Sequence, residues 1–98
     1  MNDPFDELDA QIEEQAAIAN ARLAELEDLR ALLAEGFGRR IVNRILARAG
    51  IYRTSFNVEA MNMAFLEGRR DMGIWLQSEL LEADPTEFYH AMQERNDD

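Results

Sequence analysis

The stretch GFGRRIVNRILARAGIYRTSF, residues 36–56, decides how this chain folds, because it contains the clearest break in an otherwise helical pattern. Glycines at 36 and 38 predict the end of one helix and a turn. A second helix is expected over about 39–49, with Gly50 as its C-terminal stop. The same stretch holds five of the ten basic residues of the chain. The predicted turn and the positive charge therefore fall in one place.

Two different faces are predicted for helix 39–49. Apolar residues recur on one side at the spacing of an amphipathic helix. They are Ile41, Val42, Ile45, Leu46 and Ala49. Three arginines repeat every four residues along the opposite side, at positions 40, 44 and 48. We expect the apolar face in the core and the arginines on the surface.

A long helix is predicted before the break. Asp3 and Pro4 are typical of an N-cap and a first helical position, and no helix-breaking residue follows before Glu35. About 30 residues at 1.5 Å each make a helix of about 45 Å, longer than a compact domain of this size needs. Part of it is therefore expected to project or to pair with another chain. The predicted seam of this helix is Phe5, Leu8, Ile12, Ala19, Leu23 and Leu26.

The seam leaves two alternatives open. Alanine at 16 and 19 and arginine at 30 occupy positions where a strong coiled coil has leucine or isoleucine. We favour association of this helix with a partner or with a second copy of the chain. The alternative is a solvated arm that docks on its own domain.

Two more helices are predicted downstream. The segment 50–56 is expected to be an ordered connection that packs Ile51, Tyr52 and Phe56 into the core. A third helix follows over about 58–83, in which Gly68 and Gly73 suggest close approach by a neighbour or a bend, and we favour the close approach. Asp84 and Pro85 then begin a short helix over about 85–95.

The sequence thus predicts an all-α fold. Three core helices are expected with the end of the long N-terminal helix packed across them. The expected organisation is a helical extension over residues 1–28 and a helical domain over residues 29–98. The predicted core residues are Ile41, Ile45, Phe56, Phe65, Met72, Trp75 and Leu76.

Charge is distributed unevenly along this acidic chain, whose formal net charge is −10. Residues 1–35 carry ten acids and two arginines (−8), residues 36–70 seven arginines and two acids (+5), and residues 71–98 eight acids and one arginine (−7). We favour pairing of the central arginines with carboxylates, within the chain or between subunits. Contact with nucleic acid and a solvated face stay open as alternatives. The predicted interaction or salt-bridge stripe is Arg39, Arg40, Arg44, Arg48, Arg53, Arg69 and Arg70.

Several classes of chemistry find little support. The chain has no cysteine, which excludes disulfides and thiolate metal sites. Its single histidine, His90, follows Glu87 in one Glu-x-x-His motif, whereas a di-iron bundle needs two such motifs and two further glutamates. No phosphate-binding glycine loop is present, and no apolar run approaches the roughly 20 residues of a membrane span. We expect no enzymatic activity, no metal, no cofactor and no membrane partner.

Two segments carry a resemblance to a known family. They are GRRIVNRILARAGIYRTSF, residues 38–56, and MAFLEGRRDMGIWLQSELLEADPTEFYHAM, residues 63–92. Over about residues 29–94 the chain resembles the Bbp-nineteen-like proteins of tailed bacteriophages. The resemblance implies a small helical phage protein, encoded near portal and packaging genes, without an established enzymatic activity. It also implies a location in the virion or in the host cytoplasm during assembly.

Three functional hypotheses follow. The leading one is a structural or assembly component of the virion that binds a larger head, portal or tail protein through helical surfaces, or that self-associates. The second is a DNA-binding accessory of genome packaging that uses the arginines from Arg39 to Arg53. The third is an acidic decoy that mimics DNA and occupies a DNA-binding protein of the host.

Overall fold

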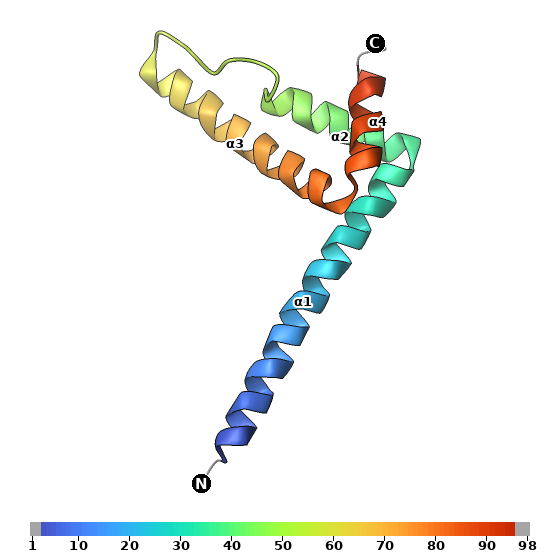
Figure 1. Cartoon of the computed structure of the whole chain (residues 1–98). Coiled ribbons are helices and arrows are strands. Elements are labelled where there is room, and N and C mark those ends of the chain that lie inside the picture. The colour runs from blue at the N-terminus through green and yellow to red at the C-terminus, as the bar shows by residue number, and fades with distance from the viewer. Residues whose placement is uncertain (1–2, 96–98) are drawn as a thin grey trace.

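The computed structural model describes residues 3–95, and its regular structure consists of four helices (Figure 1). Helix α1 spans Pro4–Ala34, α2 spans Gly36–Ala49, α3 spans Ala60–Ala83 and α4 spans Pro85–Arg95. There is no strand in the described range. The prediction of an all-α fold is therefore confirmed.

Helix α1 projects from the rest of the molecule. Its N-cap forms as predicted, because the Asp3 side chain accepts a hydrogen bond of 3.0 Å from the Phe5 backbone N–H. The helix has 31 residues, about 46 Å at 1.5 Å each. The radius of gyration is 19.2 Å, whereas a compact chain of this length has about 13 Å. The predicted projection is thus confirmed, and the blue end of the helix in Figure 1 is free of the other three helices.

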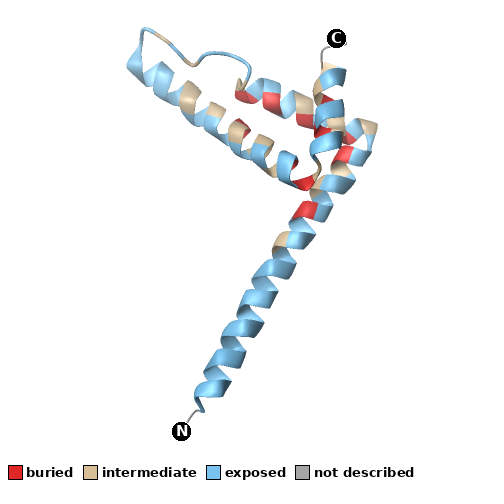
Figure 2. Ribbon diagram, viewed as in Figure 1, coloured by how far each residue is buried: buried red, intermediate tan, exposed pale blue. Residues whose placement is uncertain are grey.

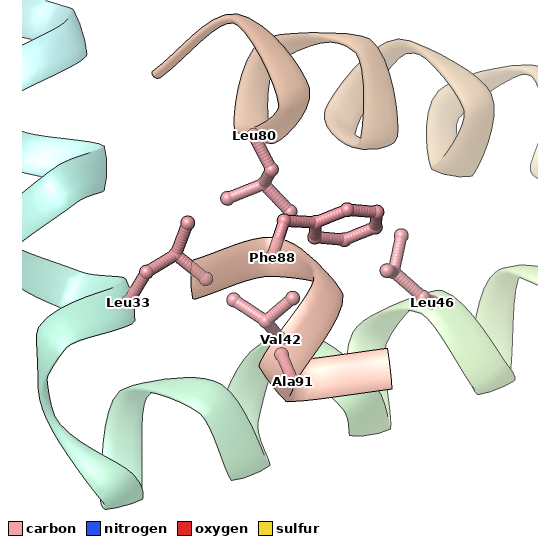
Figure 3. Close-up of a cluster of buried hydrophobic side chains, with 6 residues drawn as sticks. All are labelled: Leu33, Val42, Leu46, Leu80, Phe88 and Ala91. Atoms are coloured by element: carbon pink, nitrogen blue, oxygen red, sulfur yellow. The ribbon is translucent and has the colours of Figure 1, made fainter. Parts of the chain in front are cut away.

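All four helices meet in one core at the opposite end of α1. Six side chains in this cluster are at most 1% exposed, and Figure 3 shows Phe88 at its centre. They are Leu33 of α1, Val42 and Leu46 of α2, Leu80 of α3, and Phe88 and Ala91 of α4. Burying one such large side chain stabilises a fold by about 1.5–3 kcal/mol. The predicted packing of the end of the N-terminal helix across the other three is confirmed.

The second helix begins three residues earlier than predicted. Glu35 alone is extended, with φ −102° and ψ 138°, and α2 begins at Gly36 instead of residue 39. Gly38 is buried within α2, and a Cβ atom on it would lie 1.9 Å from the Leu32 carbonyl oxygen. This glycine therefore allows two helices to approach closely and does not form the turn. Gly50 ends α2 as predicted, in the left-handed conformation with φ 77°.

Most of the predicted core residues prove to be exposed. Of the seven, only Leu76 packs against the buried cluster. The other six have exposed fractions between 42% and 73%, and they are Ile41, Ile45, Phe56, Phe65, Met72 and Trp75. Only the C-terminal half of α3 lies against α1 and α4, while α1 leads away from its N-terminal half (Figures 1 and 2). The core prediction was wrong for these six because no element of the described chain covers them.

The connection between α2 and α3 packs against the core only at its start. Ile51 lies against the core as predicted, and the ring of Tyr52 lies under the Arg95 guanidinium, 3.7 Å from carbon to ring centroid. The prediction that Tyr52 and Phe56 pack into the core was wrong, because their exposed fractions are 37% and 73%. The third helix begins at Ala60, two residues later than predicted, after the Asn57 side chain accepts a hydrogen bond from the Glu59 N–H.

The two glycines of α3 have different surroundings. A Cβ atom on Gly73 would lie 2.5 Å from Ile51 Cγ2 and 2.6 Å from Ala49 Cβ, which confirms the predicted close approach. A Cβ atom on Gly68 would meet nothing within 4 Å. The same prediction for Gly68 was wrong.

Candidate protein-binding groove between α2 and α3

An open apolar groove lies between α2 and α3. Its volume is about 1030 Å³, and the buried Ala49 and Gly73 lie at its base. Large apolar side chains from both helices form its sides, and three arginines line it as well. The apolar side chains are Ile41 and Ile45 of α2 with Met72, Trp75 and Leu76 of α3, and the arginines are Arg44, Arg48 and Arg69. We call this set of residues the groove.

The local sequence explains why the groove is open. The apolar arc of α2 is wider than one neighbour can cover, so Val42 and Leu46 face the core while Ile41 and Ile45 remain outside it. At the base, Gly73 lets α3 contact Ala49 directly, because any side chain there would collide with it. Five of the seven residues that the sequence assigned to the core therefore line a surface site, and of these only Leu76 also packs against the buried cluster.

A second apolar surface lies beyond the groove, towards the free end of α3. We call it the tip, and it comprises Phe56, Val58, Met61 and Phe65, all strongly exposed. The guanidinium of Arg69 lies 5.8 Å from the centroid of the Phe65 ring, so this arginine links the tip to the groove.

Arg39 is the member of the predicted stripe that pairs within the chain. Its Nε donates to both carboxylate oxygens of Glu94, at 2.9 and 3.0 Å, and its Nη1 donates to the Leu33 carbonyl at 2.9 Å. Glu87 lies 3.8 Å away on α4. The hydrogen bond with Glu94 raises the pKa of Arg39 above its ordinary value, although partial burial opposes this. Arg39 therefore joins α2 to α4 and to the end of α1.

The remaining six arginines of the stripe have no carboxylate within 4.0 Å among residues 3–95. Nor do all seven form one continuous row. Arg44, Arg48 and Arg69 meet in the groove, Arg40 lies beside Arg39 and Arg44, and Arg53 lies near Arg70 around a smaller hollow at the α2–α3 connection. Internal pairing, one part of the favoured interpretation beside pairing between subunits, thus accounts for Arg39 alone. The role of the others stays a prediction.

Sequence reasoning missed two arginines that attach α1 to α3. Arg22 donates to Glu79, with Nη1 to Oε1 at 2.9 Å and a second contact from Nη2, and to Glu82 at 2.6 Å. Arg30 Nε donates to the Ala83 carbonyl at 2.6 Å. The spacing held a signal, because both arginines fall on the helix face that also carries Leu26 and Leu33.

The Arg22 contacts shift both partners' pKa values. Hydrogen bonds that Arg22 donates to Glu79 and Glu82 raise the pKa of Arg22 well above its ordinary value. The hydrogen bond from Arg22 lowers the pKa of the Glu79 carboxyl, and this outweighs partial burial, which raises it. Both groups are therefore charged at neutral pH.

The predicted seam of the N-terminal helix divides into two parts. Leu26 is buried against the fold, whereas Phe5, Leu8, Ile12, Ala19 and Leu23 are exposed. Every residue from 3 to 21 is exposed, and we call this segment the arm. An arm docked on its own domain, the less favoured alternative, is wrong for this segment.

The described residues contain no group of three histidine, aspartate or glutamate side chains arranged to hold a metal. His90 Nδ1 lies 3.4 Å from Glu87 Oε1, and the histidine side chain is half exposed. Within the same range, no helix is both long and apolar enough to cross a membrane.

Fold and site together define a small all-α protein with an arginine-lined apolar groove and a projecting acidic helix. Residues 21–94, about three quarters of the chain, match the family model described as Bbp19-like phage protein. The chain therefore belongs to the Bbp19-like phage protein family. The match begins eight residues before the resemblance seen in the sequence, at the point where α1 first contacts α3 through Arg22. Searches of curated proteins and of solved structures found no match.

Proposed function

We propose that this phage protein is a structural or assembly component of a tailed bacteriophage, without enzymatic activity. It acts by binding a larger head, portal or tail protein, in the virion or in the host cytoplasm during assembly. The observation that carries the proposal is the exposure of large apolar side chains on α2 and α3, in the groove and at the tip. Contiguous apolar surface of this kind, edged by charged residues, is typical of protein-binding sites.

The chemistry of the surface supports a protein partner. The groove combines aromatic, methionine and arginine side chains, the residue types that are enriched at protein interfaces. In addition, the family description names a phage protein and no reaction.

The experiment compares two substitutions on α3 in phage carrying the altered gene. Phe65→Ser removes an exposed ring from the tip, and Leu81→Ser removes an exposed side chain that is in neither the tip nor the groove. Mass spectrometry of purified particles and of complexes captured from infected cells should find the Leu81→Ser chain with a head, portal or tail protein. The Phe65→Ser chain should be depleted. If the unaltered chain is found neither in particles nor in any complex with those proteins, the proposal fails.

The unpaired arginines favour a second candidate, a DNA-binding accessory of genome packaging. Six arginines of the stripe have no carboxylate partner in the described range and could contact phosphates. The net charge of −10 opposes this function at long range. Binding to duplex DNA should then weaken steeply between about 50 and about 200 mM salt, and less steeply for Arg40→Gln with Arg44→Gln. No measurable binding at the lower salt concentration would exclude it.

A further inference from the structure

The arm continues a helix face that is already an interface. On a helix of 3.6 residues per turn, Leu26 and Leu33 lie on the same face as Phe5, Leu8 and Ile12. Leu26 and Leu33 are buried against the chain's own fold, while Phe5, Leu8 and Ile12 are exposed. The arm thus presents an unpartnered apolar stripe in a helix that is held firmly at its other end.

The charges of the arm lie away from this stripe. The arm has six carboxylates and no basic residue, a formal charge of −6. On the same projection all five acids of its helical part lie outside the stripe, and Asp9 borders the edge at which Phe5 and Ile12 lie. A partner surface that covers the stripe would therefore place the residues at its edge close to these carboxylates.

The groove has the complementary character. Three arginines line it and no acid does, and none of the three has a carboxylate within 4.0 Å among residues 3–95. Its length also fits. The walls run from Ile41 to Arg48 and from Arg69 to Leu76, eight residues or about 12 Å each, and the segment from Phe5 to Ile12 has the same length.

We infer that the groove of one chain binds the arm of a second copy, with Phe5, Leu8 and Ile12 against its apolar walls and the acidic edge of the arm beside its arginines. The chain's own arm leads away from its groove in one uninterrupted helix (Figure 1). Pairing of two arms would instead bring two segments of charge −6 together along a seam weakened by Ala16 and Ala19. The inference rests on the proposed protein-binding role of the groove and names its occupant.

Trp75 makes the association measurable. It is the only tryptophan of the chain and lies exposed in the groove. As concentration rises from micromolar to sub-millimolar, sedimentation should show association of the full chain, and Trp75 fluorescence should shift to shorter wavelength as the groove is covered. Ile12→Asp in the arm and Met72→Asp in the groove should each weaken association about tenfold or more. The control Ile18→Asp changes an exposed isoleucine of the arm outside the stripe and should leave association within about twofold.

Mixing the two variants distinguishes arm-in-groove binding from arm pairing. The Ile12→Asp chain keeps its groove and the Met72→Asp chain keeps its arm, so an equimolar mixture should form a one-to-one complex with the Trp75 shift. If arms pair with each other, Met72→Asp alone should still associate and mixing should add nothing. Circular dichroism checks that each variant is folded. A charge exchange gives the same test, because Asp9→Arg in one chain should restore association that Arg48→Glu weakens in the other.

The outcomes separate this inference from the proposed function. Association lost in either variant and restored by mixing supports it. A chain that stays monomeric at sub-millimolar concentration, or one whose association survives Met72→Asp, overturns it. If the chain is monomeric but Met72→Asp is depleted from particles, a different phage protein occupies the groove. In that case the proposed function stands, and the inference that a second copy of the chain occupies the groove is wrong.

Discussion

Ile45 and Leu46 are adjacent in α2, similar in size and equally apolar, yet Leu46 is fully buried and Ile45 is 48% exposed. The difference lies in what covers each side of the helix. Leu46 contacts a cluster to which all four helices contribute, whereas Ile45 faces a groove that the described chain leaves open. Burial of either apolar side chain is favourable, but it occurs only where another surface covers that side of the helix.

The same contrast extends over whole helices. The C-terminal ends of α1 and α3 pack together through Arg22, Arg30 and the core, while the N-terminal halves of both helices point away from it (Figures 1 and 2). One end of the molecule is therefore a stable core, and the other end presents surfaces for binding. Each of the following predictions tests that division.

The largest effect is expected inside the core. Leu46→Ala should lower the free energy of unfolding by about 2–5 kcal/mol, because it leaves a cavity beside Phe88. Ile45→Ala should change it by less than about 1 kcal/mol, since this side chain is half exposed. Urea denaturation of both variants at micromolar concentration measures the difference. Equal losses would mean that the groove is closed in solution by the chain itself.

The two glycines of α3 should respond in opposite directions. Gly73→Ala forces a methyl group against Ala49 and Ile51 and should destabilise the fold by about 1–3 kcal/mol. Gly68→Ala meets no neighbour and should stabilise the helix by about 0.5–1 kcal/mol. Paired thermal melts provide the measurement. Stabilisation by Gly73→Ala would show that α2 and α3 are not in direct contact at the base of the groove.

A smaller effect should appear in the pH dependence of stability. Arg22 lowers the pKa of Glu79 in the folded state. The folded state therefore binds fewer protons on this carboxyl than the unfolded state does. The resulting stabilisation is fully present above the ordinary glutamate pKa of about 4.3. It is lost as the pH falls through the lower folded value. The melting temperatures of the native chain and of Glu79→Gln should therefore differ most at neutral pH and converge as the pH falls below the ordinary pKa of a glutamate. A constant difference would mean that the Arg22 contact does not hold α1 on α3.

The smallest effect is expected in the arm. Ile18→Ser alters a side chain that is 64% exposed and lies off the apolar stripe, so the free energy of unfolding should change by no more than about 0.5 kcal/mol. A denaturation curve superimposable on that of the native chain would agree with a free arm. A clear loss of stability would indicate that the arm packs on its own fold.

The sequence predicted the elements well because their signals are local. Asp3 with Pro4, Gly50, and Asp84 with Pro85 each fix a helix end through neighbouring backbone groups, and each forms a cap in the structure. Membership of the phage family was likewise visible in the central motifs, and the family match confirms it.

Only the tertiary structure decided which apolar residues are buried. Periodicity gave helix 39–49 and the third helix broad apolar faces, but it contains no information on how many neighbours each face meets or on the direction in which α1 leaves the core. Because α1 extends outward, six of the seven predicted core residues are exposed in the groove or at the tip, and among residues 3–95 only Arg39 of the stripe has a carboxylate within 4.0 Å. The physical reason is that helix formation depends on local contacts, whereas burial and charge pairing depend on contacts between distant segments.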